Sequence, residues 1–402
     1  MRLKYNIHKA AHFIMNPYNA VFLIAWGLIL LGYWRGINNH LPVLGNMTDE
    51  LECVIILFPL FLSLSKFFKR LKTIDHIIVF SLLLCYTMNF ILFPLNEEEL
   101  MKRWFNFSIL TVPFYYIGVT LDIKKFLNAF YIISIVAVVV CSAYELLYLH
   151  SSAYVGDADT SEYNMDLSYK LLPHVLMVSW QALKESNLWK IAVMLLGIIM
   201  LLSFGTRGPV ACAITFIAIY LLFIRTSKYQ NIIRVVVVSL FVLVISFLNQ
   251  FVLFMQALIS QIGMSTRVFD KYLSGELSES LGRDYIRETI MRELSIDTSL
   301  LGHGILGSYR YVGTYPHNII LDFIFSFGWF FGIVLLFLLF LLIVKMIAGC
   351  RHDETRMTFG ILLIISSVLK LCFSGTYVDD TLFFFLLGYC VQIVWRNKKA
   401  IS

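Results

Sequence analysis

The sequence predicts an all-α membrane protein that crosses the bilayer many times, and three observations support this. Of its 402 residues, 59% are hydrophobic and only 14% are charged, whereas a soluble domain carries roughly 25% charged residues. The apolar residues come in runs of about 20, the length that an α-helix needs to cross a bilayer. These runs lack the alternation of apolar and polar residues that barrel strands require. Too little charge remains to coat a water-soluble surface.

A scan for runs of that length predicts about twelve membrane spans. Residues 1–255 hold roughly the first nine spans, residues 256–316 form one long connecting loop with an amphipathic helix, and residues 317–402 hold the last three. The predicted spans are about 19–36, 51–68, 74–95, 104–121, 126–149, 168–184, 188–205, 208–225, 232–255, 317–345, 357–374 and 379–396.

The basic residues lie mostly in alternate connections between these spans. About twenty of the 32 Lys and Arg residues occur there, as the positive-inside rule expects of cytoplasmic loops. The intervening connections are often acidic, for example at Glu97–Glu99 and at Asp379 and Asp380. The pattern predicts that both termini are cytoplasmic and that the long loop lies on the opposite, outer face.

Several kinds of chemistry have no support in the sequence. The seven cysteines fall almost all within or at the ends of apolar runs, as small packing residues do. His303, His317 and Asp322 lack the spacing of a helical or hairpin zinc site. No Walker, GxGxxG, GxSxG or HExxH motif is present, and so little surface charge does not suit nucleic-acid binding. We therefore expect no metal, no cofactor and no nucleic acid.

The long outer loop contains a predicted helix, "LGRDYIRETIMREL" at 281–294. Arg283 and Arg287 are four residues apart and share a face of it. Ile290 and Leu294 continue close to that stripe, which favours a helix lying along the membrane surface. The arginines have two interpretations. They form salt bridges on a solvated helix, or their guanidinium groups hold an anion.

The turn "SFGTRGPV" at 203–210 carries a second arginine of interest, Arg207, on the same predicted face. An arginine at this depth is costly unless it pairs with an anionic group. One interpretation is that the side chain reaches out to the interface. The flanking Gly205 and Gly208 favour a binding site, because they let a ligand approach the backbone closely.

The stretch "PHN" at 316–318 places a titratable ring at the outer end of a predicted span. Pro316 fits the first turn of a helix, so His317 and Asn318 are expected at its N-terminus. The helix dipole disfavours an imidazolium there and attracts phosphate. A neutral imidazole can act as a general base; the alternative is a polar residue that only caps the helix. Asp322 lies about one turn further on.

Taken in order, "GTRGPV", "SLGRDYI", "LLGHGILGSY" and "PHNIILDFIFSFGWFFGIV" resemble the motifs of the O-antigen polymerase and O-antigen ligase superfamily. The last motif corresponds to His317, Asn318 and Leu321 followed by Gly328 and Gly332. The N-terminal "MNPYNAVFLIAWGLILLGY" is similar to the start of many Wzy-type repeat-unit polymerases. Many members have an acid just before the final glycine pair, where this sequence has Ser326.

The resemblance implies a membrane glycosyltransferase that uses sugars linked to undecaprenyl pyrophosphate at the outer face of a bacterial inner membrane. Arg207 and Arg283 would clamp the pyrophosphate and stabilise charge on the leaving group. His317 would deprotonate or orient the acceptor hydroxyl. No metal or nucleotide would be needed, because the donor is already activated. Further residues expected to bind or orient the substrate are Asn318, Arg287, Tyr309, Asp322 and Gly208.

Three functions remain open within this interpretation. A polymerase transfers the growing glycan to the next lipid-linked repeat unit, and the N-terminal resemblance favours it. A ligase transfers the glycan to lipid A-core with the same site. A lipid-linked oligosaccharide flippase would need charged groups inside the spans and repeat symmetry, and Lys370 is the one clear cation within a predicted span. The expected partners are the lipid-linked oligosaccharide, membrane lipid, a chain-length regulator and a flippase.

Overall fold

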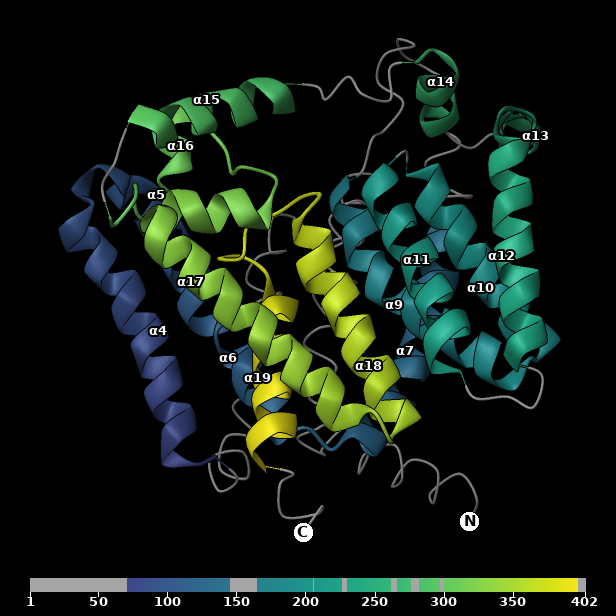
Figure 1. Ribbon diagram of the computed structural model, residues 1–402, viewed down its shortest axis with the longest axis horizontal. Helices are drawn as coiled ribbons and strands as arrows, with labels where there is room; N and C mark the ends of the chain where they lie inside the picture. Colours follow the sequence, from purple (N-terminus) through teal and green to yellow (C-terminus); the bar gives the residue numbers. More distant parts are fainter. Residues whose placement is uncertain are drawn as a thin grey trace, which may run out of the picture. The chain divides into compact units, whose positions relative to one another are not determined.

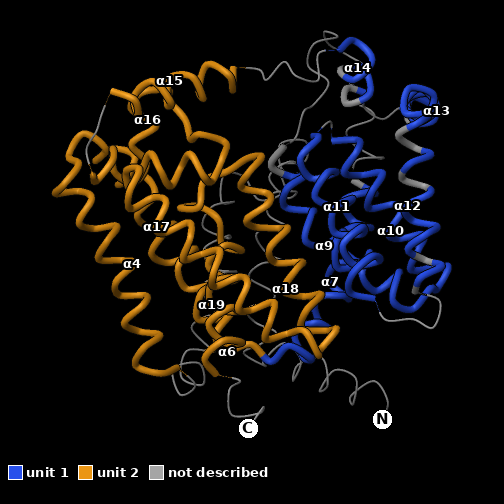
Figure 2. Tube along the Cα trace, in the orientation of Figure 1, with its two compact units in different colours: residues 1–70, 122–276 blue, residues 71–121, 277–402 orange. Residues whose placement is uncertain are grey.

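A computed structural model describes residues 71–144, 165–204, 206–225, 230–261, 266–275, 282–296 and 300–396. Within these residues every regular element is helical and no strand occurs (Figure 1). The chain divides into unit 1, residues 1–70 and 122–276, and unit 2, residues 71–121 and 277–402 (Figure 2). The all-α prediction is therefore confirmed for the described residues. The predicted spans 19–36 and 51–68 lie outside them.

Four of the described helices are long and apolar enough to cross a membrane. They cover Thr73–Leu92, Ile123–Ala143, Arg207–Ile224 and Ile319–Cys350. The shorter apolar helices are Leu188–Ser203, Leu248–Leu258 and Thr381–Arg396. These helices fit a membrane protein, and the count of twelve spans and their orientation stay predictions.

Unit 1 is built around α9 (Met165–Glu185), which packs against three other helices. These are α7 (Ile123–Tyr144), α10 (Leu188–Ser203) and α11 (Arg207–Ile219), the last continued by the π-helical segment η4 (Tyr220–Ile224). Two polar contacts fix its neighbours to α9. His174 Nδ1 lies 3.0 Å from Ser134 Oγ of α7, and Thr206 Oγ1, just before α11, donates to Ser168 Oγ at 2.6 Å. The unit also contains α12 (Gln230–Ser246), α13 (Leu248–Gln261) and α14 (Arg267–Leu273).

Two predicted spans are interrupted. The predicted span 232–255 is split between α12 and α13 at Phe247. The predicted span 104–121 is divided among α5 (Glu97–Phe105), the π-helical segment η2 (Asn106–Thr111) and α6 (Pro113–Thr120). Pro113 lacks a backbone N–H, so it cannot continue the hydrogen-bond ladder of the preceding turn. Hydropathy alone does not register such a break.

Unit 2 contains α4 (Thr73–Leu92), the 3₁₀ turn η1 (Pro94–Asn96), α5, η2 and α6, and then every element from α15 onward. The tightest helix pair is α6 and α19 (Thr381–Val391). A Cβ atom on Gly118 would lie 2.3 Å from Phe385 O, and one on Gly388 would lie 2.0 Å from Tyr115 O. The remaining elements are α15 (Arg283–Ile296), α16 (Ser308–Val312), α17 (Ile319–Cys350), α18 (Glu354–Ile364) and the π-helical segments η6 (Ile365–Leu369) and η7 (Gln392–Arg396).

Helix α17 is kinked at Gly328, which has φ 77° and ψ 166°. The kink frees backbone carbonyls from the helical ladder, and a neighbouring segment binds two of them. His303 N donates to Phe325 O at 2.9 Å, and Gly304 N donates to Ser326 O at 3.0 Å. The close approach depends on glycine, since a Cβ atom on Gly302 would lie 2.3 Å from Gly328 N. Residues 302–304 thus replace the hydrogen bonds that the kink removes, as non-helical backbone in a membrane protein requires.

Candidate functional site

Helix α17 begins at Ile319, two residues later than the sequence predicts, and Asn318 is its N-cap. The Asn318 Oδ1 atom accepts hydrogen bonds from Ile320 N at 2.9 Å and Leu321 N at 3.4 Å. His317 therefore precedes the helix. Its φ of 55° is in the left-handed region, which a residue other than glycine adopts rarely and at a cost. Such a backbone outlier is a common mark of a functional position.

The His317 ring lies partly buried beside Tyr315, with the ring centroids 4.3 Å apart. Its Nδ1 atom is buried and has no hydrogen-bond partner among the described residues. Burial, and secondly the positive charge of Arg283, lower the pKa of His317 to about 4. The ring is therefore neutral at pH 7, as a general base must be. The sequence predicted a neutral ring from the helix dipole, whereas here burial and an arginine are the causes.

Arg283 is the first residue of α15, which confirms a helix in the predicted stretch 281–294. Ile290 and Leu294 are buried, and they pack against Ile324 and Phe325 of α17. The helix thus covers α17, whereas the sequence suggested that this stripe lies along the membrane. The packing brings the partly exposed Arg283 close enough to His317 to act on its charge.

The other predicted arginines are placed differently. Arg287 is exposed on α15. Arg207 and Gly208 are the first two residues of α11 in unit 1, and both are partly exposed. Arg283 and His317 therefore belong to one compact unit, and Arg207 belongs to the other.

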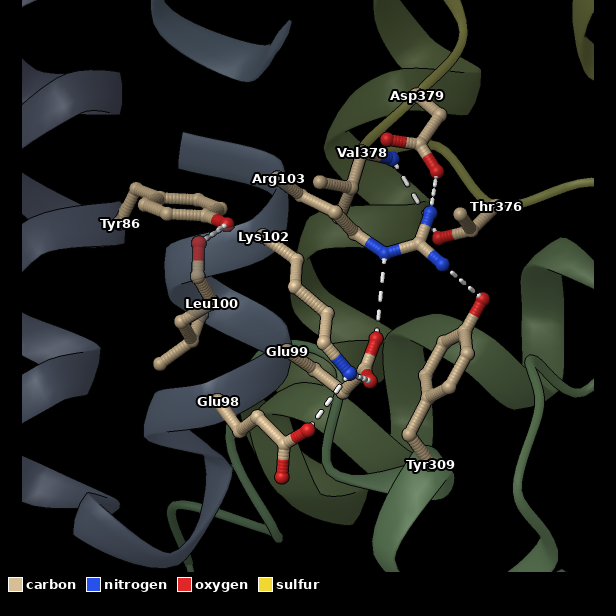
Figure 3. A network of polar contacts seen from close by, with 10 residues as sticks. All are labelled: Tyr86, Glu98, Glu99, Leu100, Lys102, Arg103, Tyr309, Thr376, Val378 and Asp379. Carbon is tan, nitrogen blue, oxygen red and sulfur yellow. Dashed lines mark hydrogen bonds and ion pairs between the residues drawn. The ribbon is translucent and has the colours of Figure 1, made fainter. Parts of the chain in front are cut away.

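Tyr309, in α16, takes part in a polar network centred on Arg103 of α5 (Figure 3). Arg103 Nη2 donates to Tyr309 Oη at 2.6 Å, and its Cζ atom lies 4.7 Å from the centre of the Tyr309 ring. Arg103 Nη1 donates to Asp379 Oδ2, and Arg103 Nε lies 3.7 Å from Glu99 Oε2. Burial is the main cause that raises the pKa of Tyr309, so the phenol stays neutral at pH 7. Arg103 belongs to none of the motifs found in the sequence.

Asp322 is 3% exposed and accepts a hydrogen bond from Thr376 Oγ1 at 2.8 Å. Thr376 belongs to the segment between η6 and α19 that also carries Ser374 and Asp379. Asp322 therefore fixes this segment to the first turns of α17. Its buried position and its contact with Thr376 suit a supporting role more than direct contact with a sugar.

Lys370, the cation noted within a predicted span, forms an ion pair with Asp380 of 2.6 Å. The Asp380 side chain also caps α19, because its Oδ1 atom accepts from Phe383 N at 2.8 Å. A cation within a membrane span needs an anionic partner, and the buried Asp380 is that partner for the partly exposed Lys370.

The site therefore combines a neutral imidazole on a strained backbone, a guanidinium whose charge acts on that ring, and a network of tyrosine, arginine and carboxylate groups within unit 2. The described residues contain no group of three or more His, Cys, Asp or Glu side chains that could hold a metal ion. Comparisons with protein families, with curated proteins and with solved structures found no match for this chain.

Proposed function

We propose that the protein is a membrane polysaccharide polymerase that transfers a growing glycan from undecaprenyl pyrophosphate to a sugar hydroxyl of the next lipid-linked repeat unit. The observation that carries the proposal is the setting of His317 just before α17, where its backbone is strained and the charge of Arg283 acts on its ring. The His317 backbone is in the left-handed region, its Nδ1 atom has no partner among the described residues, and burial and the charge of Arg283 lower the pKa of the ring. The motif resemblance supplies the substrate class.

In the proposed reaction the acceptor hydroxyl oxygen bonds to the anomeric carbon of the donor glycan. The bond between that carbon and the pyrophosphate oxygen breaks, and the pyrophosphate leaves with its lipid. His317 accepts the hydroxyl proton, a role that typically contributes 10²–10⁴-fold to a rate. Arg283 stabilises the charge that develops on the leaving pyrophosphate, because a guanidinium fork matches phosphate oxygens.

The location of His317 fits such a substrate. Helix α17 is apolar and 32 residues long, and His317 lies two residues before its first turn. A lipid-linked sugar keeps its tail in the bilayer and its head in water, so its reacting bond lies at the interface. His317 directly precedes the cap of a helix that is long and apolar enough to cross a membrane, and this supports the proposal.

The ligase function uses the same residues and differs only in the acceptor, lipid A-core. The flippase function is less well supported. Its main support was the Lys370 cation, and that side chain pairs with Asp380.

The test is glycan length in a strain that lacks the gene and carries it back on a plasmid, as wild type or as His317→Ala. We expect wild type to restore long chains and His317→Ala to leave single repeat units on lipid A-core. His352→Ala is the matched control, because His352 is exposed beyond the other end of α17. Membrane levels of each variant are measured by immunoblot.

Two outcomes would change the proposal. Polymer that accumulates on undecaprenyl pyrophosphate and never reaches lipid A-core in the deletion strain would identify a ligase. Full complementation by His317→Ala at normal protein level would show that His317 is not the base.

A further inference from the structure

Two segments of unit 2 meet at Tyr315, the residue that lies beside the His317 ring. The first runs from Ser308 through α16 to the Asn318 cap and carries His317 itself. The second runs from Ser374 to Asp380 and leads into α19. They meet directly at the hydroxyls of Tyr315 and Ser374, whose oxygens lie 3.5 Å apart. Because Tyr315 also packs on the His317 ring, the position of the ring depends on how the two segments are held together.

Arg103 contacts both segments from a third element, α5. One terminal nitrogen donates to Tyr309 of the first segment, and the other donates to Asp379 of the second. Figure 3 shows the guanidinium between these two side chains, with Glu99 on the Nε side. The planar guanidinium fixes both directions at once, which a lysine ammonium does not do as well. The Arg103 side chain is 24% exposed and that of Asp379 is 29% exposed, so the pair is partly shielded from water.

The second segment is also fixed by contacts with Asp322 of α17 and with Lys370. Thr376 donates to the buried Asp322 of α17, and Asp380 caps α19 while binding Lys370. In the first segment, Gly313 is in the left-handed region with open space around it, and Tyr315 contacts Ser374 of the second segment. The contact from Arg103 to Tyr309 holds α16, the first part of that segment, at a fixed place relative to the second segment.

We propose that Arg103 is a positioning residue that holds the His317 segment against the Ser374–Asp380 segment and so keeps the His317 ring in its buried place beside Tyr315. The proposal rests on the proposed function only where it concerns glycan transfer. Its structural part concerns the His317 ring alone. Arg103 itself touches no reacting atom in this scheme.

The experiment follows the titration of His317 by NMR in the full-length protein, labelled with ¹³C-histidine in lipid nanodiscs. The His317 signal is identified by its loss in His317→Gln. The groups that act on this ring are Tyr315 beside it and Arg283 of α15. In wild type the ring is expected to stay neutral down to about pH 5, because its pKa is lowered to about 4. In Arg103→Gln the ring gains water, and its titration midpoint is expected to rise by about one pH unit or more toward the ordinary value of about 6.5.

Lys102→Gln is the matched control. Lys102 is the neighbouring cation on α5, its side chain is 56% exposed, and it pairs with Glu98 and Glu99 of its own helix. This variant is expected to leave the His317 midpoint unchanged. Tyr309→Phe is a milder change that removes one hydrogen bond and keeps the ring, and it should move the midpoint in the same direction by less. Arg103→Lys should restore part of the wild-type value.

A midpoint that rises in Arg103→Gln and Tyr309→Phe but not in Lys102→Gln supports the proposal. If Arg103→Gln and Tyr309→Phe both fold and neither changes the titration midpoint of His317, the proposal is wrong. Glycan length measured in parallel separates the two proposals. A misplaced catalytic group can cost on the order of 10²-fold in rate, so Arg103→Gln should shorten the glycan ladder. A raised midpoint with unaltered glycan would support positioning by Arg103 and contradict the catalytic role of His317.

Discussion

His303 and His317 lie on one stretch of unit 2, and both pack against aromatic rings, yet their settings differ. The His303 ring stacks on Phe325 with centroids 4.2 Å apart, its Nδ1 atom lies 3.3 Å from Tyr311 Oη, and its backbone N binds the kinked part of α17. The His317 backbone is strained, and its Nδ1 atom is buried without a partner among the described residues. The first histidine has the contacts of a structural residue. The second differs from it in its strained backbone and in the charge of Arg283 that acts on its ring.

The two turns that contain glycines, residues 302–304 and the turn at Gly313, differ in how tightly they are packed. The turn at 302–304 is locked to α17 by backbone hydrogen bonds and by contact too close for any side chain. The turn at Gly313, which leads to His317, has open space around it. Mutations in the first turn should therefore act on stability, and mutations near His317 should act on transfer.

The largest expected effect is that of Gly328→Ala. A Cβ atom there would lie 2.5 Å from Leu300 O, and φ is 77°. Backbone strain and overpacking together should cost on the order of 4 kcal/mol. Gly313→Ala has the same kind of φ, 69°, but no atom within 4 Å, and it should cost about 1–2 kcal/mol. Thermal unfolding in detergent measures both, and equal losses would contradict the difference between the turns.

Among the substitutions that leave the fold intact, Arg283→Gln is expected to lower the rate of glycan transfer most. Loss of a preorganised donor to the leaving group typically lowers a rate by about 10²–10³-fold. Arg283 also lowers the pKa of His317, so removing it should raise that pKa. The protonated, inactive fraction of His317 would then be larger at pH 5.5 than in wild type and nearly unchanged at pH 8.

The measurement is the rate of glycan transfer by purified protein at these two pH values. Arg283→Lys keeps the charge and loses the fork, so it should retain the wild-type pH dependence while binding phosphate less well. Full activity of Arg283→Gln would show that Arg283 does not bind the pyrophosphate.

The sequence predicted the parts of this site that depend on local pattern. Apolar runs predicted the long helices, the period of 281–294 predicted α15, and "PHN" placed His317 at the start of α17. Arg103 escaped notice because its partners, Tyr309 and Asp379, lie 206 and 276 positions away along the chain. In the sequence, Arg103 ends a short stretch of acidic and basic residues, a pattern typical of a solvent-exposed helix. The contact of residues 302–304 with the Gly328 kink is also long-range. The sequence contains the glycines at both places, but no local pattern shows that they meet.

His303 variants test the structural side of the comparison with a moderate effect. His303→Phe keeps the stack on Phe325 and loses the contact with Tyr311, which should cost about 1 kcal/mol. His303→Ala loses the stack as well, for a further cost of about 0.5–1.5 kcal/mol. Both should support normal glycan length once protein levels are matched. Loss of transfer in His303→Phe at wild-type stability would give this histidine a functional role too.

The smallest expected effect concerns Asn318, which the sequence placed among the substrate-binding residues and which caps α17. Asn318→Ala should cost about 1 kcal/mol of stability, the usual value of an N-cap. Asn318→Asp keeps an oxygen that can accept from Ile320 N, and it should keep most of the stability. The two variants separate the cap from substrate binding, because aspartate lacks the amide N–H donors. If Asn318→Asp is stable and transfers glycan normally, the residue acts through the helix end alone. If it is stable but loses transfer, the amide donates to the substrate beside His317, and the strained turn provides two contacts to the reacting sugar.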